Sequence, residues 1–432
     1  MRKTPGVLIV GALVVVLSAG PGRGENWPQW RGPFFNGSTT EKDLPTKFSP
    51  TENVVWSADL PGVSGSTPIV WNDRVFVTAM EPASKKLWAL CLNGTDGTVR
   101  WKRPMGKGFT NQMGNTGASP SPITDGKGVW FSFGTGQVTA MDMAGKVRWQ
   151  RDLQKDHGAF EIMWRYGGTG LLYAGRLYIA VLHGDHNVGG RRDVSYLLCV
   201  DPATGKDLWK RPRVTDAPRE SRQAYITPFP LVRKDGVQIL LHGADHLTGH
   251  DPTDGRELWR SPNYNPRKNA WLRTVPSAVG DGDVAVGCAP KGGRLFAVRT
   301  VASDGEKAGS LLWTTRRNSP DVCTPLIYQG KLFVLDGRKK ELVCMEPRTG
   351  KVIWQGKLGA KAVFQASPTG ADGKVYCINL HGEAVVVSAG EKFEVLHRAN
   401  MGGRGVRSMI VAAGGRLLIR TDTKLYCIGK KG

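Results

Sequence analysis

A tryptophan recurs at nearly regular intervals along this chain, each time at the end of a similar sequence repeat. It stands at Trp56, Trp101, Trp149, Trp209, Trp259, Trp313 and Trp354, and His397 takes the eighth place. The steps between neighbours are 45, 48, 60, 50, 54, 41 and 43 residues. Periods of this size, accompanied by alternating apolar residues and glycine-rich turns, are typical of β-propeller blades and not of helical solenoids.

The unit between residues 323 and 354 shows the repeat most clearly. A small residue and Pro325 introduce an apolar run, and two apolar segments follow at 331–334 and 342–345. A turn at 347–351 then leads into the last segment, which ends at Trp354. Four short strands of this kind match one propeller blade.

The turn before the closing tryptophan has a fixed chemistry in the best units. Asp201 stands eight residues before Trp209 and is followed by Gly205, and Glu346 and Gly350 precede Trp354 in the same way. The carboxylate accepts backbone N–H bonds in such a turn, and glycine supplies the positive φ that a tight reversal needs. We therefore interpret these acidic residues as turn residues and not as metal ligands.

The two ends of the chain supply one blade between them. After His397 the sequence predicts three strands, at 408–413, 416–420 and 424–428, but no closing tryptophan. The segment 53–57 around Trp56 precedes the first full unit and provides the missing strand. The sequence thus predicts an all-β protein, a single eight-bladed β-propeller of four-stranded blades over residues 53–432, closed by pairing of the N- and C-terminal strands.

The first residues have the order of a secretory signal peptide. Arg2 and Lys3 precede an apolar run at 7–17, and small residues follow at 18–22. The run is shorter than the roughly 20 apolar residues of a membrane span, so we expect cleavage of residues 1–24, with a retained anchor as the alternative. We expect a periplasmic or secreted monomer, in which residues 25–52 form an extension that packs on the propeller.

The charge and the cysteines exclude several classes of function. The formal net charge is +22, but the basic residues are spread thinly along the chain, so we expect no nucleic-acid partner. Anionic lipid or acidic cell-wall material is the alternative partner for such a surface. None of the seven cysteines is adjacent to another or forms a Cys-x-x-Cys pair, which predicts isolated buried thiols and no zinc site.

The turn phrases around Asp201 to Trp209 and Glu346 to Trp354 resemble the tryptophan-docking motif of pyrroloquinoline-quinone (PQQ) propellers, and residues 26–33 resemble the opening of exported PQQ-like proteins. The resemblance implies two branches. Quinoprotein alcohol dehydrogenases bind PQQ and calcium beneath a ring of adjacent cysteines, and BamB-like proteins are non-enzymatic scaffolds. Because adjacent cysteines and recognisable calcium carboxylates are absent from the sequence, we expect no cofactor.

Function is expected where the long loops gather. The loops that lead into the inner strand of each blade, termed leading loops below, share one end of a propeller with the loops between second and third strands. His183, His242 and His381 fall in the latter, where we interpret them as hairpin residues and expect no metal. The leading loops bring aromatic and arginine side chains to the channel mouth, namely Trp164, Arg165, Tyr166, Arg222, Tyr225, Trp271, Arg273, Arg404 and Arg407.

This mixture suits an anionic, partly planar ligand or a protein contact. The alternative is that the aromatic residues fill the channel as core and that the arginines are solvated. The sequence contains no local catalytic motif. We therefore expect an exported, non-catalytic binding or scaffold module for a protein, a glycan or a small anionic ligand, and a divergent PQQ-dependent oxidoreductase is the alternative.

Overall fold

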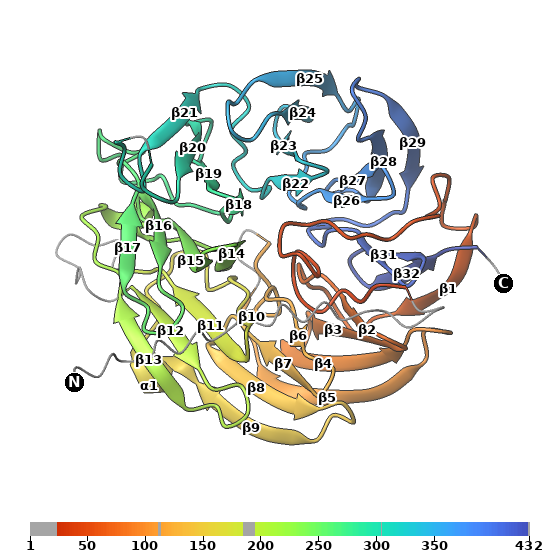
Figure 1. Cartoon of the computed structure of the whole chain (residues 1–432). Helices are drawn as coiled ribbons and strands as arrows, with labels where there is room; N and C mark the ends of the chain where they lie inside the picture. Colours follow the sequence, from red (N-terminus) through yellow and green to blue (C-terminus); the bar gives the residue numbers. More distant parts are fainter. Residues whose placement is uncertain (1–23, 111–113, 185–194, 304, 431–432) are drawn as a thin grey trace, which may run out of the picture.

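The computed structural model describes residues 24–110, 114–184, 195–303 and 305–430. These residues form eight four-stranded antiparallel sheets that follow one another around a central axis (Figure 1). The predicted all-β, eight-bladed propeller is confirmed. The predicted signal peptide falls almost wholly on residues 1–23, outside the described residues. No helix in the described part of the chain is both long and apolar enough to cross a membrane.

In each of the first seven blades the strands run from the axis outward in chain order. The first four blades consist of β2 (Ile69–Trp71), β3 (Arg74–Met80), β4 (Lys86–Asn93) and β5 (Val99–Lys107); β6 (Ile123–Thr124), β7 (Gly128–Ser132), β8 (Gln137–Asp142) and β9 (Val147–Asp152); β10 (Leu171–Tyr173), β11 (Arg176–Val181), β12 (Tyr196–Val200) and β13 (Asp207–Pro212); β14 (Phe229–Arg233), β15 (Gly236–Gly243), β16 (His246–His250) and β17 (Glu257–Arg260).

The remaining four blades consist of β18 (Val279–Asp281), β19 (Val284–Cys288), β20 (Leu295–Arg299) and β21 (Leu311–Thr315); β22 (Leu326–Tyr328), β23 (Lys331–Asp336), β24 (Glu341–Met345) and β25 (Val352–Lys357); β26 (Thr369–Ala371), β27 (Lys374–Ile378), β28 (Glu383–Ser388) and β29 (Val395–Asn400); β30 (Val411–Ala413), β31 (Arg416–Arg420), β32 (Lys424–Ile428) and β1 (Val54–Asp59). Two short helices, α1 (Leu153–His157) and a 3-10 turn (Arg219–Arg222), lie in leading loops.

The ring closes in the eighth blade, where the first strand of the chain joins the last three. Strand β1 pairs antiparallel with β32, and Trp56 lies opposite Cys427 in the register. The sheet edge that an open ring would expose is therefore covered. The predicted closure by the N- and C-terminal strands is confirmed.

The closing tryptophans join neighbouring blades. Trp149 Nε1, in the second blade, donates to the carbonyl of Pro202 in the third blade at 2.9 Å. In the same way, Trp354 Nε1 of the sixth blade donates to the carbonyl of Gly390 in the seventh blade at 2.9 Å. A Cβ on Gly205, whose φ is +75°, would lie 2.7 Å from the Trp149 ring. Glycine at this turn is thus required twice, for the backbone conformation and for the approach of the indole.

A second set of contacts links the blades around the channel. At seven of the eight seams, the backbone N–H of one blade donates to a serine or threonine hydroxyl of the next, at 2.9 to 3.4 Å. The residues of this hydroxyl belt, each near the start of an inner strand, are Thr67, Ser121, Thr169, Thr227, Ser277, Thr324 and Ser367. In the eighth blade the corresponding residue is Met409, which has no hydroxyl group. At the seam between the seventh and eighth blades, Thr369 Oγ1 donates instead to the carbonyl of Ile410, at 2.5 Å.

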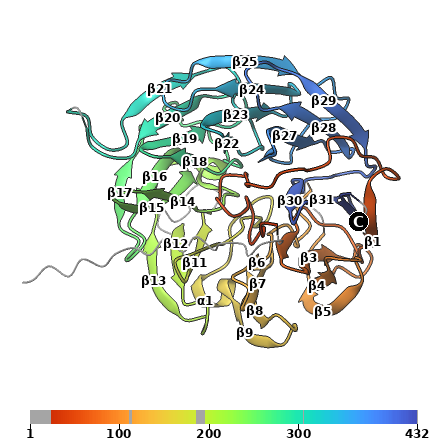
Figure 2. The same ribbon diagram turned by 45° about the vertical axis from the view of Figure 1, so that its right-hand side comes forward.

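The segment before β1 crosses the channel at the end opposite the leading loops (Figure 2). Trp27 exchanges two backbone hydrogen bonds with Val70 of the first blade, and the Gln29 side chain exchanges two with Leu172 of the third. In the eighth blade, which adjoins the first, the Glu41 carboxylate accepts from the backbone N–H groups of Gly414 and Gly415, at 2.9 and 2.7 Å. One short segment therefore ties together blades that are far apart in the sequence.

Arg31 is the centre of this channel plug, which we define as residues 27–37. Its buried guanidinium donates to the carbonyls of Asn36, Pro325 and Pro368, and burial lowers its pKa to about 9. The cavity left between the plug and the belt residues Thr227, Ser277 and Thr324 has a volume of only about 10 Å³. The plug therefore packs closely against these belt residues.

We predict that Trp354→Ala lowers the free energy of unfolding by about 3 to 5 kcal/mol, because the indole is 7% exposed and fills the seam between the sixth and seventh blades. Trp271→Ala, which removes a side chain that is 47% exposed, is the control and is expected to change stability much less. Equal denaturant midpoints for the two variants would contradict the docking role.

Candidate functional site

Two buried carboxylates lie among the leading loops, where the sequence pointed only to aromatic and arginine residues. Glu220, in the 3-10 turn before the fourth blade, is 4% exposed, and Asp321, before the sixth blade, is 7% exposed. Trp164 Nε1 donates to Glu220 Oε1 at 2.8 Å. Arg273 lies between the two carboxylates, with Nε 3.7 Å from Glu220 Oε1 and Nη1 3.3 Å from Asp321 Oδ1.

Two further cations complete this group, which we call the mouth network. Arg338 Nη2 lies 3.1 Å from Asp321 Oδ2, and Lys291 Nζ lies 3.9 Å from Glu220 Oε2. Both come from loops between second and third strands, as the shared end of the ring requires. Three cations thus face two buried carboxylates, and the one positive charge in excess lies on the solvent-facing side, where the Arg338 side chain is 70% exposed.

Four of the predicted residues belong to this network or touch it. Two of the four are Trp164 and Arg273, described above. The third is Tyr225, whose hydroxyl accepts a hydrogen bond from Trp164 N at 3.3 Å. Trp271 accepts a hydrogen bond at its carbonyl from Lys291 Nζ, and its exposed ring lies 5.9 Å from the Arg219 guanidinium. The third to sixth blades therefore contribute to one cluster.

Three more of the predicted residues, Tyr166, Arg222 and Arg165, contact groups outside the mouth network. Tyr166 is 3% exposed, and its hydroxyl donates to Ala180 O at 3.3 Å, so this side chain is core. Arg222 Nε donates to Ala217 O at 2.6 Å. Arg165 is exposed and lies over the ring of Phe109 at 5.2 Å.

Arg404 and Arg407, from the leading loop of the eighth blade, lie in another part of the mouth. Arg407 is half-buried, and its Nε donates to Gln365 Oε1 at 2.8 Å. Arg404 is exposed, and its backbone N–H donates to Asp422. The aromatic and arginine residues predicted for the mouth thus fall into one connected cluster and several separate positions.

The loop that carries Trp271 and Arg273 is anchored by a buried carboxylate outside the network. Asp245 is fully buried, and the Asn265 amide donates to both of its oxygens at 3.1 Å. Burial raises the pKa of Asp245 to about 7, and the Asn265 hydrogen bonds oppose this rise only in part. The Asp245–Asn265 contact therefore holds the loop, and the burial of Asp245 makes the stability of the protein depend on pH.

The described residues contain no group of three or more His, Cys, Asp and Glu side chains that could hold a metal ion. Asp185 and His186 of one predicted histidine hairpin lie outside the described residues, and His242 is buried in another. All seven cysteines are free and buried. Burial raises the pKa of Cys344 to about 12, which keeps this thiol protonated at neutral pH.

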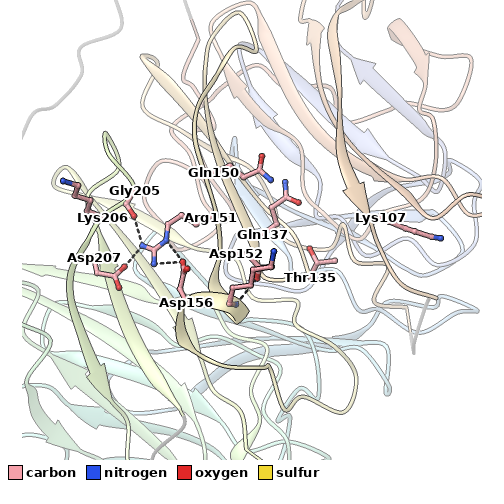
Figure 3. Close-up of a pocket in the computed structure, with 11 residues that line it drawn as sticks. Lys107, Thr135, Gln137, Gln150, Arg151, Asp152, Asp156, Gly205, Lys206 and Asp207 are labelled. Carbon is pink, nitrogen blue, oxygen red and sulfur yellow. Dashed lines mark hydrogen bonds and ion pairs between the residues drawn. The ribbon is translucent and has the colours of Figure 1, made fainter.

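A separate groove of about 930 Å³ lies outside the channel, against the outer strand of the second blade. It is lined by residues of the first three blades, and Figure 3 shows Arg151 at its wall between Asp156 and Asp207. Of the residues that line this groove, the sequence pointed only to Gly205, as a turn residue and not as part of a binding site.

The fold and its mouth define a PQQ-repeat type of propeller with a charged, loop-rich opening. A family model described as outer membrane protein assembly factor BamB matches residues 38–184, 163–307 and 299–430. These matches extend over most of the chain, so the chain belongs to this family of PQQ-like β-propellers, as the sequence resemblance implied.

Among proteins of known activity, the chain is similar to a polyvinylalcohol dehydrogenase of Sphingopyxis sp. (strain 113P3), with 25% identity over 384 residues. The match covers 79% of this chain and 54% of the relative, so the chain spans about half the length of that enzyme.

Solved structures share the fold, and two of them represent the two branches that the sequence resemblance implied. The quinohemoprotein alcohol dehydrogenase from Comamonas testosteroni superposes with a TM-score of 0.65 at 14% identity, over 94% of this chain and 81% of that one. BamB from Moraxella catarrhalis superposes with a TM-score of 0.60 at 13% identity, over 87% of this chain and 99% of that one.

These findings correct the functional prediction. The absence of adjacent cysteines and of recognisable calcium carboxylates predicted a non-catalytic binding or scaffold module, with a divergent PQQ-dependent oxidoreductase as the alternative. The relative detected by sequence is a dehydrogenase. The alternative is therefore the better-supported reading, and the expectation of a non-enzyme was wrong because it was based on two features of one branch of the family.

We predict that Asp245→Asn becomes progressively more stabilising, relative to the unchanged protein, as pH rises from 4 to 7. The unfolded carboxyl ionises near its ordinary pKa of 3.8 and the folded one only at about 7, so ionisation favours unfolding across this window, by up to about 4 kcal/mol. Denaturant midpoints at pH 4.5 and 8 measure the difference.

The control is Asp235→Asn in the same blade. Its carboxyl is exposed, and the hydrogen bond from Arg233 holds its pKa below the ordinary value, so this variant gains no stability as pH rises. A stability difference for Asp245→Asn that is the same at both pH values would contradict the prediction.

Proposed function

We propose that this protein is an extracytoplasmic quinoprotein-type oxidoreductase that oxidises alcohol groups at the mouth network. The observation that carries the proposal is the pair of buried carboxylates, Glu220 and Asp321, held by cations at the end of the channel opposite the plug. The similarity to a dehydrogenase supports the same class of reaction.

The residues of the mouth network fit the quinone cofactor of this family. PQQ is a planar ortho-quinone with three carboxylates, and when bound it supplies the oxidant that takes up two electrons and two protons from an alcohol. Arg273, Lys291 and Arg338 carry one positive charge more than the two carboxylates balance, which suits an anionic ligand. The exposed ring of Trp271 offers a face for a planar group.

The chain departs from the dehydrogenase branch in two respects. It has no adjacent cysteines, and the described residues hold no cluster of three carboxylates or imidazoles. We therefore assign no residue to a metal and none to a ring above the quinone.

Glu220 is the residue that we assign to the proton of the alcohol. Its Oε1 is fixed by the hydrogen bond from Trp164, whereas Oε2 has Lys291 Nζ, 3.9 Å away, as its only polar partner among the described residues. Asp321, in contrast, has partners on both oxygens, namely Arg273, Arg338 and the backbone N–H of Lys291. Glu220 Oε2 is thus the carboxylate oxygen with a free lone pair for the substrate hydroxyl.

The apolar run at 7–17 supports export of the chain to the periplasm or the exterior. An export signal agrees with the placement of the reaction outside the cytoplasm. Fractionation of cells that express the full-length chain checks this location.

The protein with PQQ and calcium is expected to reduce an artificial electron-accepting dye when a secondary alcohol is added. The reason is that the site provides cations for the cofactor and a carboxylate for the hydroxyl proton. Dye bleaching is measured against the same protein without PQQ. Turnover no higher than in that blank, together with no binding of PQQ, would refute the proposed function.

Glu220→Gln is expected to lower kcat for the alcohol by about 100-fold to 10,000-fold, the usual range for loss of a general base. The amide retains an acceptor for Trp164, so PQQ binding, followed by quenching of tryptophan fluorescence, is expected to be retained. Glu257→Gln, on an outer strand beside Arg260, is the matched control and leaves kcat unchanged. An unchanged kcat for Glu220→Gln would remove this residue from the mechanism.

A further inference from the structure

The groove outside the channel is lined by eleven residues, and none of them has an apolar side chain. Lys107 comes from the end of β5, and Thr135 and Gln137 come from the β7–β8 region. Gly205 and Lys206 lie in the turn before β13 and Asp207 begins that strand, while β9 and α1 form the middle of the groove. The ends of β5 and β9 and the β7–β8 turn belong to the end of the ring where the mouth network lies, whereas the β12–β13 turn at Gly205 belongs to the opposite end. The groove therefore lies on the outer side of the ring, between the second and third blades.

One wall of the groove is fixed by its own contacts. Arg151 forms ion pairs with Asp156, at 2.8 Å, and with Asp207, and it donates to Gly205 O at 2.6 Å (Figure 3). His157 Nε2 lies 3.2 Å from the other Asp207 oxygen. These groups satisfy one another, so the wall is preorganised and its charges are not the groups that a ligand would use.

The groups that remain for a ligand are amides and lysine amines. The Gln150 side chain is exposed and makes no hydrogen bond with any described residue, and Gln137 Nε2 donates only to Thr139 Oγ1, at 3.2 Å. A side-chain amide both donates and accepts, as an alcohol hydroxyl does. Lys107, Lys155 and Lys206 extend the row of donors along the groove.

The charge of the lining selects between kinds of ligand. Four cationic and three anionic side chains line the groove, so the site is close to neutral and offers little attraction for a polyanion. Its volume of about 930 Å³ is at the upper end of the range for small-molecule pockets. An uncharged, extended ligand rich in hydroxyl groups matches these features.

We infer that this groove is an accessory binding site for a neutral, hydroxyl-rich polymer chain. This inference rests on the proposed function, since it names a polymeric alcohol as the substrate. The groove and the mouth network are connected by α1 and the leading loop of the third blade: Gln154 donates to Thr135 O at 2.7 Å and accepts from Phe160 N at 2.9 Å, four residues before Trp164. A chain held in the groove raises the effective concentration of its hydroxyl groups at the mouth.

The test measures binding of polyvinyl alcohol to the full-length protein without PQQ, by isothermal titration calorimetry. The double variant Gln137→Ala, Gln150→Ala is expected to bind the polymer about tenfold more weakly, because it loses two amides that hydrogen-bond to hydroxyl groups. A short diol, 2,4-pentanediol, is expected to bind much more weakly than the polymer because it occupies a small part of the groove.

Gln355→Ala is the matched control, since Gln355 follows the closing Trp354 as Gln150 follows Trp149, but it lies outside the groove. Equal polymer affinity of the double variant and the unchanged protein overturns the inference, and so does binding of dextran sulfate with no binding of polyvinyl alcohol. Because no cofactor or turnover is involved, failure of the groove here and failure of the dye assay for the proposed function are separate results.

Discussion

The propeller depends on contacts that hold each blade to the next. At the periphery an indole lies on the turn of the following blade, as Trp149 does on Gly205, and near the axis a backbone N–H bonds to the hydroxyl of the following blade, as Thr67 N does to Ser121 Oγ. The two sets act at different radii, so a blade is fixed both in position and in tilt. Every functional loop is positioned by this frame.

The fold could be predicted from the sequence because the repeat makes it redundant. The seven closing tryptophans and the turn residues before them each indicate the same four-stranded blade pattern. The strand around Trp56 completes the last blade, since β1 pairs with β32. The path of residues 27–37 was not predictable in this way. Its bonds, such as that from Arg31 to Pro368, join single residues that share no pattern in the sequence.

The site was predictable only in part, for a physical reason. The aromatic and arginine residues of the leading loops predicted a charged mouth and included Trp164 and Arg273, which lie in the mouth network. Burial of Glu220 and Asp321 was not predictable, because it depends on which loops meet across the ring. The one signal in the sequence was an acidic residue between two arginines, Arg219 and Arg222, in a leading loop. Likewise, no local pattern brings Lys107 and Lys206 to one groove, because they come from different blades.

The bond from Arg31 to Pro368 has a consequence for the time course of folding. It spans 337 residues, and Glu41 bonds to Gly414 over 373, so the segment around Arg31 and Glu41 finds these partners only after residues 368 and 414 have been synthesised. Contacts of such long sequence range form late and slowly, because a large loop must close first. The central blades can assemble from local hairpins, whereas the plug and β1 are the last parts to dock. A chain shortened at its C-terminus would therefore leave its N-terminal segment without partners.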